Sequence, residues 1–420
     1  MKHHTSRLSR LFVAGMLSLS AFTLSACSDL VAGSSNSNNV SLIVSPTTNE
    51  LYVFNLLNHR VIDKLSTGSR PDDLAVSSDS RRILVSNIND GSISVFERLT
   101  GTEFIGRGKI NVQGTKPQGV AFNNDGRRAY VSVGDTASIA VLDTSIPSRL
   151  PNLVRSIRIP FNNSSANRPS PSQIAVSQDG NRLFVIDQAN GALLAFNKTQ
   201  EDNFTVSEVF RPDPQSRVEF RDVIVDRSNR VYLIDSSNDQ LLVFNGGNIQ
   251  QPVAQVTLKD AQFPVVSPEN IVINNSGTRL YITGSAANVI SVINQPSQLQ
   301  GNIQIQQSGG NIPINTDGSR PATSPTGIDI TSNDQQIYVT NGGGGFNISL
   351  LESSGQQVRP IRNIGTAASA ANAPPLGRMK IIFFNTLAGQ SAARIQSEDA
   401  STADAADTDT PVSELSRLPF

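Results

Sequence analysis

Carboxylate and carboxamide side chains recur along the chain at the edges of short apolar runs, where their oxygen atoms could bind a hard cation. Ca²⁺ and similar ions take oxygen ligands from Asp, Glu and Asn. The same residues can instead cap the turn that follows a strand, and we expect capping at most of these positions and no bound cofactor. The set comprises Asp72, Asp73, Asn87, Asp90, Asp135, Asp187, Asp222, Asp235, Asp239, Glu269 and Asn341, with Asn55 in the first repeat. The candidate ligands, should Ca²⁺ bind, are Asn87, Asp187, Asp235 and Glu269.

Side chains for nucleophilic catalysis are scarce. Cys27 is the one cysteine, and of the three histidines only His59 lies beyond the N-terminal leader. A Ser/His/Asp triad would have to use His59, and a lone histidine in a turn is more often simply exposed. Zinc sites built from Cys and His are excluded, and no phosphate-binding glycine motif follows a strand. We therefore predict no catalytic residue from these types.

Arginines form a second recurrent set, each just after a turn and before an apolar run. Exposed on one face, they would make a basic rim able to bind an anionic polymer, and the alternative is that they are solvated turn residues. The formal charge of −1 gives no general attraction to nucleic acid, which we regard as an unlikely partner. The set comprises Arg81, Arg82, Arg127, Arg128, Arg182, Arg227, Arg230 and Arg279.

A repeat positions both sets. A turn and the strand after it recur seven times, as "SPTTNELYVFN", "SSDSRRILVSN", "NNDGRRAYVSV", "SQDGNRLFVID", "DRSNRVYLID", "NNSGTRLYITG" and "TSNDQQIYVTN". Residues 40–365, divided by seven, give about 47 residues for each unit. Periods of about 40 to 50 residues with short alternating strands are typical of propeller blades. The fullest copies begin with a proline, which is Pro71, Pro117, Pro171, Pro268 or Pro325.

The predicted fold is therefore an all-β, seven-bladed β-propeller of four-stranded blades. In strand order A to D, the A–B turns lie on one face, and the B–C turns and D–A connections lie on the other. The arginines belong to the first face and the acids to the second. The longest D–A connections are expected at residues 161–170 and 307–324, on the acidic face, where long loops favour a binding role.

The stretches "DGRRAYVSV", "QQIYVTN" and "ELYVFN" resemble the YVTN family of β-propellers, and "YVTN" itself occurs at Tyr338–Asn341. That family includes surface-layer proteins, periplasmic binding proteins and, more distantly, lactonase-type propellers. The resemblance implies the architecture over residues 40–365. It also implies one alternative function, because lactonases similar to regucalcin hold a catalytic metal with a Glu/Asn/Asp cluster.

The first 39 residues are typical of a bacterial lipoprotein. Basic residues precede the apolar run "LFVAGMLSLSAFTL", which is too short to span a bilayer. The run ends in "LSAC", which resembles a lipobox, so we predict a signal peptide at residues 1–26 and a lipidated Cys27 followed by a flexible tether to residue 39. Ser28 after the cysteine favours the outer membrane. The expected location is the cell envelope, anchored by lipid.

After residue 365 the sequence becomes rich in Ala and Ser, and it ends in an acidic tail that we predict to be disordered. The apolar residues 378–386 are expected to form an extra strand near the first and last blades. The favoured function at this stage is a non-enzymatic lipoprotein whose propeller binds a protein or a cell-surface polymer. A metal-dependent lactonase-like hydrolase at the acidic mouth of the channel, and anionic-polymer binding by the arginines, stay open as alternatives.

Overall fold

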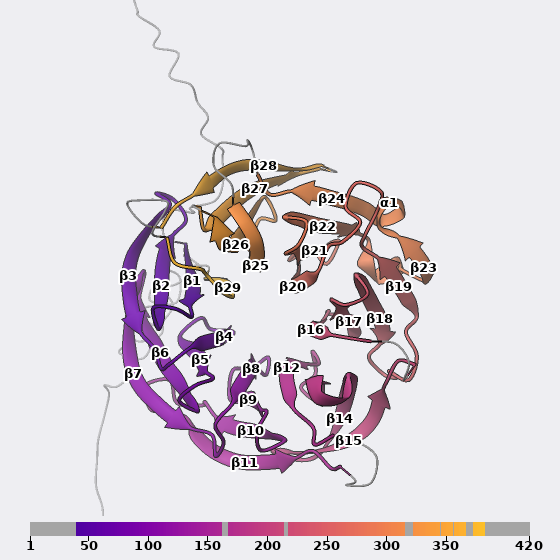
Figure 1. Cartoon of the computed structure of the whole chain (residues 1–420). Coiled ribbons are helices and arrows are strands. Elements are labelled where there is room, and N and C mark those ends of the chain that lie inside the picture. The colour runs from indigo at the N-terminus through magenta and orange to yellow at the C-terminus, as the bar shows by residue number, and fades with distance from the viewer. Residues whose placement is uncertain are drawn as a thin grey trace, which may run out of the picture. The chain divides into compact units, whose positions relative to one another are not determined.

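Seven antiparallel sheets surround a common axis in the computed structural model (Figure 1). The structure describes residues 39–161, 167–213, 217–315, 322–344, 346–355, 357–366 and 373–382. The predicted all-β, seven-bladed propeller is confirmed. The N-terminal segment with Cys27 and the acidic tail lie outside the described residues. In the described part of the chain, no helix is long and apolar enough to cross a membrane.

Each blade runs outward from the axis in four strands. Blade 1 contains β29 (Met379–Ile382), β1 (Val40–Ser45), β2 (Glu50–Asn55) and β3 (Arg60–Ser66). Blade 2 contains β4 (Pro71–Val76), β5 (Arg82–Asn87), β6 (Ser92–Thr100) and β7 (Glu103–Asn111). Blade 3 contains β8 (Pro117–Phe122), β9 (Arg128–Val133), β10 (Ser138–Asp143) and β11 (Asn152–Arg158). Blade 4 contains β12 (Pro171–Val176), β13 (Arg182–Asp187), β14 (Ala192–Gln200) and β15 (Asn203–Phe210). Blade 5 contains β16 (Phe220–Val225), β17 (Arg230–Asp235), β18 (Gln240–Asn245) and β19 (Ala254–Thr257). Blade 6 contains β20 (Pro268–Ile273), β21 (Arg279–Gly284), β22 (Val289–Asn294) and β24 (Gly309–Pro313). Blade 7 contains β25 (Ala322–Ile330), β26 (Gln336–Gly344), β27 (Ile348–Ser354) and β28 (Gln357–Ile364).

The C-terminal strand β29 closes the ring. It pairs with β1 and is the innermost strand of blade 1, whose other three strands come from the N-terminal end of the propeller (Figure 1). A strand was predicted within residues 378–386, but it completes a blade and is not an addition to seven complete ones. The segment "ELYVFN" is therefore strand C of blade 1 and not strand B. Residues 40–365 alone lack the seventh inner strand.

Apolar side chains pack between neighbouring blades. Tyr130 of blade 3, for example, packs edge-on against Phe204 of blade 4, with ring centroids 5.5 Å apart. Both belong to one cluster that draws buried residues from these two blades. Because the faces of one blade are covered by the next, a single blade could not bury its own apolar residues.

The longest insertion of blade 6 lies on the face of the A–B turns, and not on the face of the D–A connections where one was predicted at residues 307–324. Residues 307–324 include β24, which is strand D of blade 6, so the D–A connection itself is only residues 314–321. The longer insertion is the C–D connection at residues 295–308. It contains η3 (Pro296–Gln298), β23 (Gly301–Gln304) and α1 (Ile305–Ser308), and β23 adds to blade 5 in parallel with β19.

Five arginines join neighbouring blades instead of forming an exposed rim. Each is the first residue of strand B, and its guanidinium reaches the C–D connection of the next blade. The expectation of exposure is wrong for Arg82, whose exposed fraction is 2%, and for Arg279, at 9%. Of the eight predicted arginines, Arg81, Arg127 and Arg227 are exposed. The five contacts are Arg82 to the Ile146 carbonyl, Arg128 to the Asp202 carboxylate, Arg182 to the Gly246 carbonyl, Arg230 to the carbonyls of Pro296 and Leu299, and Arg279 to the Gly355 carbonyl.

Arg82→Ala should destabilise the propeller, whereas Arg127→Ala should not. Arg82 loses a charged hydrogen bond between blades, which is typically worth about 1.5–3 kcal/mol, while Arg127 is exposed. Urea unfolding of both variants measures the difference. Equal free energies of unfolding for the two variants would contradict the assignment of Arg82 to blade contact.

Candidate functional site

The innermost strands bring equivalent residues of all blades to the channel. A β-bulge interrupts the pairing of strands A and B in blades 2 to 7, so two successive residues face one residue of strand B. A hydroxyl of strand B accepts the bulge N–H in several blades, as Ser86 does from Asp73 at 3.1 Å. The bulge therefore places two successive residues of each of these six blades at the start of the inner strand, next to the D–A connection.

These positions form two rings. The first residue of each pair follows the leading proline, or Phe220 in blade 5, and blade 1 contributes the equivalent residues before β29 by its register with β1. The mouth ring consists of Asp72, Gln118, Ser172, Arg221, Glu269, Thr326 and Gly377. The inner ring consists of Asp73, Gly119, Gln173, Asp222, Asn270, Gly327 and Arg378.

Arg378 links three blades in the inner ring. It comes from blade 1, and its Nη1 lies 3.2 Å from Oδ1 of Asp222 in blade 5. Its Nε lies 3.6 Å from Oδ1 of Asp73 in blade 2. Burial opposes the charge of Arg378, but Asp222, Asp73 and Asp72 outweigh it and raise the arginine pKa. The guanidinium therefore stays charged and compensates buried carboxylates.

Both of these aspartates also bind backbone N–H groups of the following blade. Oδ2 of Asp73 accepts the Val120 N–H at 2.9 Å, and Oδ2 of Asp222 accepts the Ile271 N–H at 3.1 Å. Asp329 of blade 7 does the same with Ile381 of β29, at 2.7 Å. Burial raises the pKa of Asp73 to about 6, while Arg378 and the Val120 N–H act in the opposite direction. Asp73 and Asp222 thus serve the ring itself.

In the mouth ring, Asp72, Glu269 and Arg221 make fewer hydrogen bonds and ion pairs across the ring than Asp73, Asp222 and Arg378 do. Burial raises the pKa of Glu269, an effect that Arg221 and a hydrogen bond from Ser285 partly offset. Nε of Arg221 lies 3.7 Å from Oε2 of Glu269, and its Nη2 lies 2.6 Å from Oε1 of Glu219. Burial also raises the pKa of Asp72, against the charges of Arg378 and Arg70. The mouth ring therefore offers two carboxyl groups whose pKa values burial raises above those of exposed acids.

Three mouth-ring residues of consecutive blades carry a polar atom without a hydrogen-bond partner, although Nε of Arg221 keeps its ion pair with Glu269. Oε1 of Gln118, Oγ of Ser172 and Nε of Arg221 are buried and make no hydrogen bond within the described structure. An unpaired buried polar atom costs about 1–3 kcal/mol. A water molecule or a polar group of a ligand at the mouth ring would remove that cost.

The other predicted acids and amides hold the D–A connections. Oδ1 of Asn87 accepts the Gly68 N–H at 3.0 Å, and Oδ1 of Asp187 accepts the Ser170 N–H at 2.9 Å. Oδ1 of Asp235 accepts the Glu219 N–H at 3.2 Å, and Oδ1 of Asp239 accepts the Val266 N–H of the next blade at 3.0 Å. Asp90 accepts the N–H of Ser69, Asp135 accepts that of Thr115, and Asn341 donates to the Phe346 carbonyl.

The hydrogen bonds made by the candidate Ca²⁺ ligands show how their oxygen atoms are used within the chain. Asn87, Asp187, Asp235 and Glu269 come from blades 2, 4, 5 and 6, and the first three use an oxygen to cap backbone. Among the residues that the structure describes, no group of three His, Cys, Asp or Glu side chains could hold a metal ion. Three of the four candidates therefore already bind backbone, as expected for capping residues, and a cation shared by the four stays a hypothesis.

His59 and Asn55 lie on the opposite face. They bound the C–D turn of blade 1, because "ELYVFN" is strand C. Nε2 of His59 lies 3.1 Å from the Tyr338 hydroxyl, and burial, followed by the charge of Arg362, lowers the His59 pKa to about 4. His59 therefore lies in a turn, as expected, but it is half-buried, away from the acids, and it joins blades 7 and 1.

Solved structures share this fold. A proposed 6-phosphogluconolactonase from Bacteroides fragilis matches with a TM-score of 0.62 at 14% identity, over 84% of this chain and all of that one. The periplasmic gluconolactonase PpgL of Pseudomonas aeruginosa matches at 0.63 and 14% identity, over 83% and 99%. A Lactobacillus plantarum protein matches at 0.65 and 12% identity, over 82% and 99%. At such identities the likeness shows the fold alone. No family model and no curated protein matches the chain, so membership of the YVTN family stays a prediction.

Proposed function

We propose that this chain is a lactonase-like hydrolase that opens a small, neutral, hydroxylated lactone at the mouth ring. The observation that carries the proposal is the pairing of Glu269, whose pKa is raised, with Arg221, beside unpaired polar atoms of Gln118 and Ser172. Raised carboxyl pKa values concentrate at functional sites. The gluconolactonase among the structural neighbours supports the same reaction class.

The residues can be given roles in the reaction. Glu269 as a carboxylate takes a proton from water, and the water oxygen bonds to the lactone carbonyl carbon. The oxyanion so formed accepts a hydrogen bond from Arg221. As the carbonyl re-forms, the ring C–O bond breaks and the leaving oxygen takes the proton from Glu269. The product is the hydroxy acid, and every proton is accounted for without a metal ion.

The charges of the two rings favour a neutral substrate. Asp72, Asp73, Asp222 and Glu269 are four carboxyl groups, against the two guanidiniums of Arg221 and Arg378. Arg378 already contacts two of the acids. The remaining donors and acceptors, including Gln118 and Ser172, suit hydroxyl groups. A phosphorylated lactone would meet excess negative charge.

Glu269→Gln should lower the lactonase kcat/KM about 100-fold or more, the typical contribution of a general base. The assay follows acid release from glucono-δ-lactone by the purified propeller, with uncatalysed hydrolysis subtracted. In the wild type, the acidic limb of the pH profile should lie above pH 4.5, the ordinary glutamate pKa, because burial raises that of Glu269. 6-Phosphogluconolactone should react more slowly.

The matched control is Glu352→Gln. Glu352 pairs with Arg359 on the outer strands of blade 7, at 2.6 Å, far from the inner strands in the blade. This variant should keep full activity. Wild-type protein that is folded but turns over neither lactone would contradict the hydrolase proposal.

Binding of a protein or cell-surface polymer without turnover is the second candidate. It is favoured by one observation: Asp73, Asp222 and Arg378 satisfy each other and hold the blades together, which leaves few free groups for chemistry. A lactone that protects the propeller against unfolding but is never hydrolysed would support this function over the first.

Anchoring to the outer membrane through Cys27 is a further part of the proposal, and it rests on the sequence of the first 28 residues alone: the basic residues, the apolar run, "LSAC" and Ser28. Several acyl chains would give firm attachment, since each buried methylene contributes about 0.8 kcal/mol. The propeller would then work in the cell envelope.

Cys27→Ala should move the protein from the detergent phase to the aqueous phase, or leave an uncleaved precursor, in a detergent partition of expressing cells. No second cysteine could carry the lipid. Ser28→Ala is the control and should partition like the wild type. Detergent-phase partition of mature Cys27→Ala protein would contradict lipid attachment.

A further inference from the structure

The C–D connection of blade 6 borders an open, solvent-accessible cavity on the face opposite the mouth ring. The cavity has a volume of about 930 Å³ and is bounded by residues between Asn294 and Gly309. That size falls in the range of small-molecule sites, about 300–1,000 Å³. Nothing in the lactonase proposal uses this region.

The cavity walls are anchored to the propeller core. Leu299 is buried, and the carbonyls of Pro296 and Leu299 accept hydrogen bonds from Arg230 of blade 5. The Gly301 N–H donates to the Val253 carbonyl at 2.9 Å, and β23 continues this contact by pairing with β19. Ile303 packs against the core cluster of blades 5 and 6. The walls are thus already in place before a ligand arrives, which reduces the ordering cost of binding.

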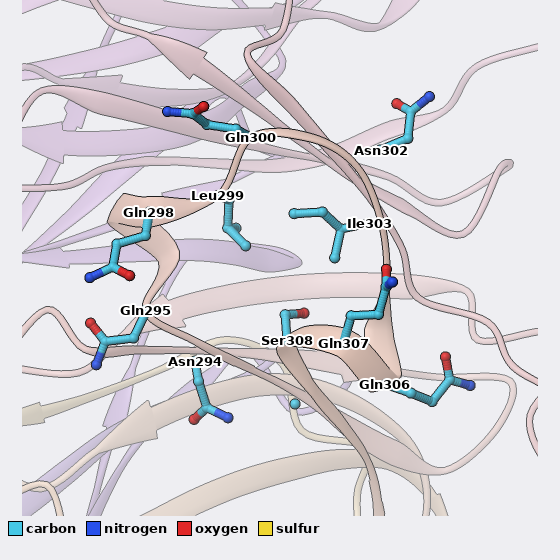
Figure 2. Close-up of a pocket in the computed structure, with 11 residues that line it drawn as sticks. Asn294, Gln295, Gln298, Leu299, Gln300, Asn302, Ile303, Gln306, Gln307 and Ser308 are labelled. Atoms are coloured by element: carbon cyan, nitrogen blue, oxygen red, sulfur yellow. The ribbon is translucent and has the colours of Figure 1, made fainter.

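The lining is neutral and rich in amides. Seven of its eleven residues are Asn or Gln, and none is charged. Among the described residues, the side chains of Gln295, Gln298, Gln300, Asn302 and Gln306 make no hydrogen bond. Figure 2 shows Leu299 and Ile303 between Gln295 and Gln298 on one side and Gln306 and Gln307 on the other. Leu299 and Ile303 therefore lie between two groups of exposed amides, of which only Gln307 accepts a hydrogen bond, from the Gln304 N–H, in the described structure.

From this arrangement we infer a binding site for a neutral glycan chain. A carboxamide both donates and accepts hydrogen bonds, as a sugar hydroxyl does, so each free amide can pair with a hydroxyl in either sense. The C–H face of a sugar ring suits Ile303, which is partly exposed, while Leu299 is buried. A charged polymer would find no opposite charge in the lining. A peptide residue offers the amides one N–H and one C=O, whereas a sugar residue offers several adjacent hydroxyl groups that each donate and accept.

The test measures binding of neutral tetrasaccharides of glucose and of N-acetylglucosamine by calorimetry. Gln298→Ala, Gln300→Ala and Gln306→Ala, combined, should weaken binding at least tenfold. The control combines Gln178→Ala, Gln200→Ala and Gln262→Ala, three exposed glutamines outside the cavity, and should bind like the wild type. Binding should be the same in about 50 mM and about 500 mM salt, because screening acts on charges.

Three results would overturn the inference. They are no binding of either tetrasaccharide by the wild type, equal binding by the cavity variant, or binding that salt abolishes. Binding of an uncharged decapeptide in preference to both sugars would assign the cavity to peptides. Since Glu269→Gln leaves this cavity intact, loss of lactonase activity and loss of glycan binding can be told apart.

Discussion

The ring depends on the ion pairs that Arg378 makes with Asp73 and Asp222. Two carboxylates buried without a counter-charge would be costly, and a buried charge is tolerated only when it is paired and hydrogen-bonded. The counter-charge arrives with β29, the strand that closes the ring. Because both aspartates also accept N–H groups from the next blade, one guanidinium ties closure to the packing of blades 2, 3, 5 and 6.

This arrangement divides the inner residues into two layers with different roles. The bulge that brings Asp73 and Asp222 to Arg378 also brings Asp72, Arg221 and Glu269 to the neighbouring positions of the mouth ring. Asp73 and Asp222 of the inner layer are paired with Arg378 and with backbone N–H groups, while the mouth layer keeps buried polar atoms that make no hydrogen bond in the described structure. The inner ring therefore provides a rigid support for mouth-ring residues that still have polar atoms available for binding and chemistry.

The repeat made the blades and their turns predictable, because apolar alternation and turn residues are local signals. The way the ring closes was not predictable, because the pairing of β29 with β1 joins residues more than 300 positions apart in the sequence. The acids were found by residue type, but their partners are backbone N–H groups of other segments, as for Asp239 and Val266, which sequence spacing does not show. Gln118, Ser172, Arg221 and Arg378 were missed, although the first two directly follow leading prolines. The arginines looked exposed because their carbonyl partners lie in the next blade, about 60 to 80 residues away.

The most direct measurement compares urea unfolding of Arg378→Met with that of the triple variant Arg378→Met, Asp73→Asn, Asp222→Asn at neutral pH. Removing one partner of a buried ion pair typically costs about 3–5 kcal/mol, so the single variant should be strongly destabilised. The triple variant should recover most of that loss, because asparagine keeps an oxygen for the N–H groups and carries no charge. A single variant as stable as the wild type, or a triple variant no more stable than the single, would contradict closure by charge compensation.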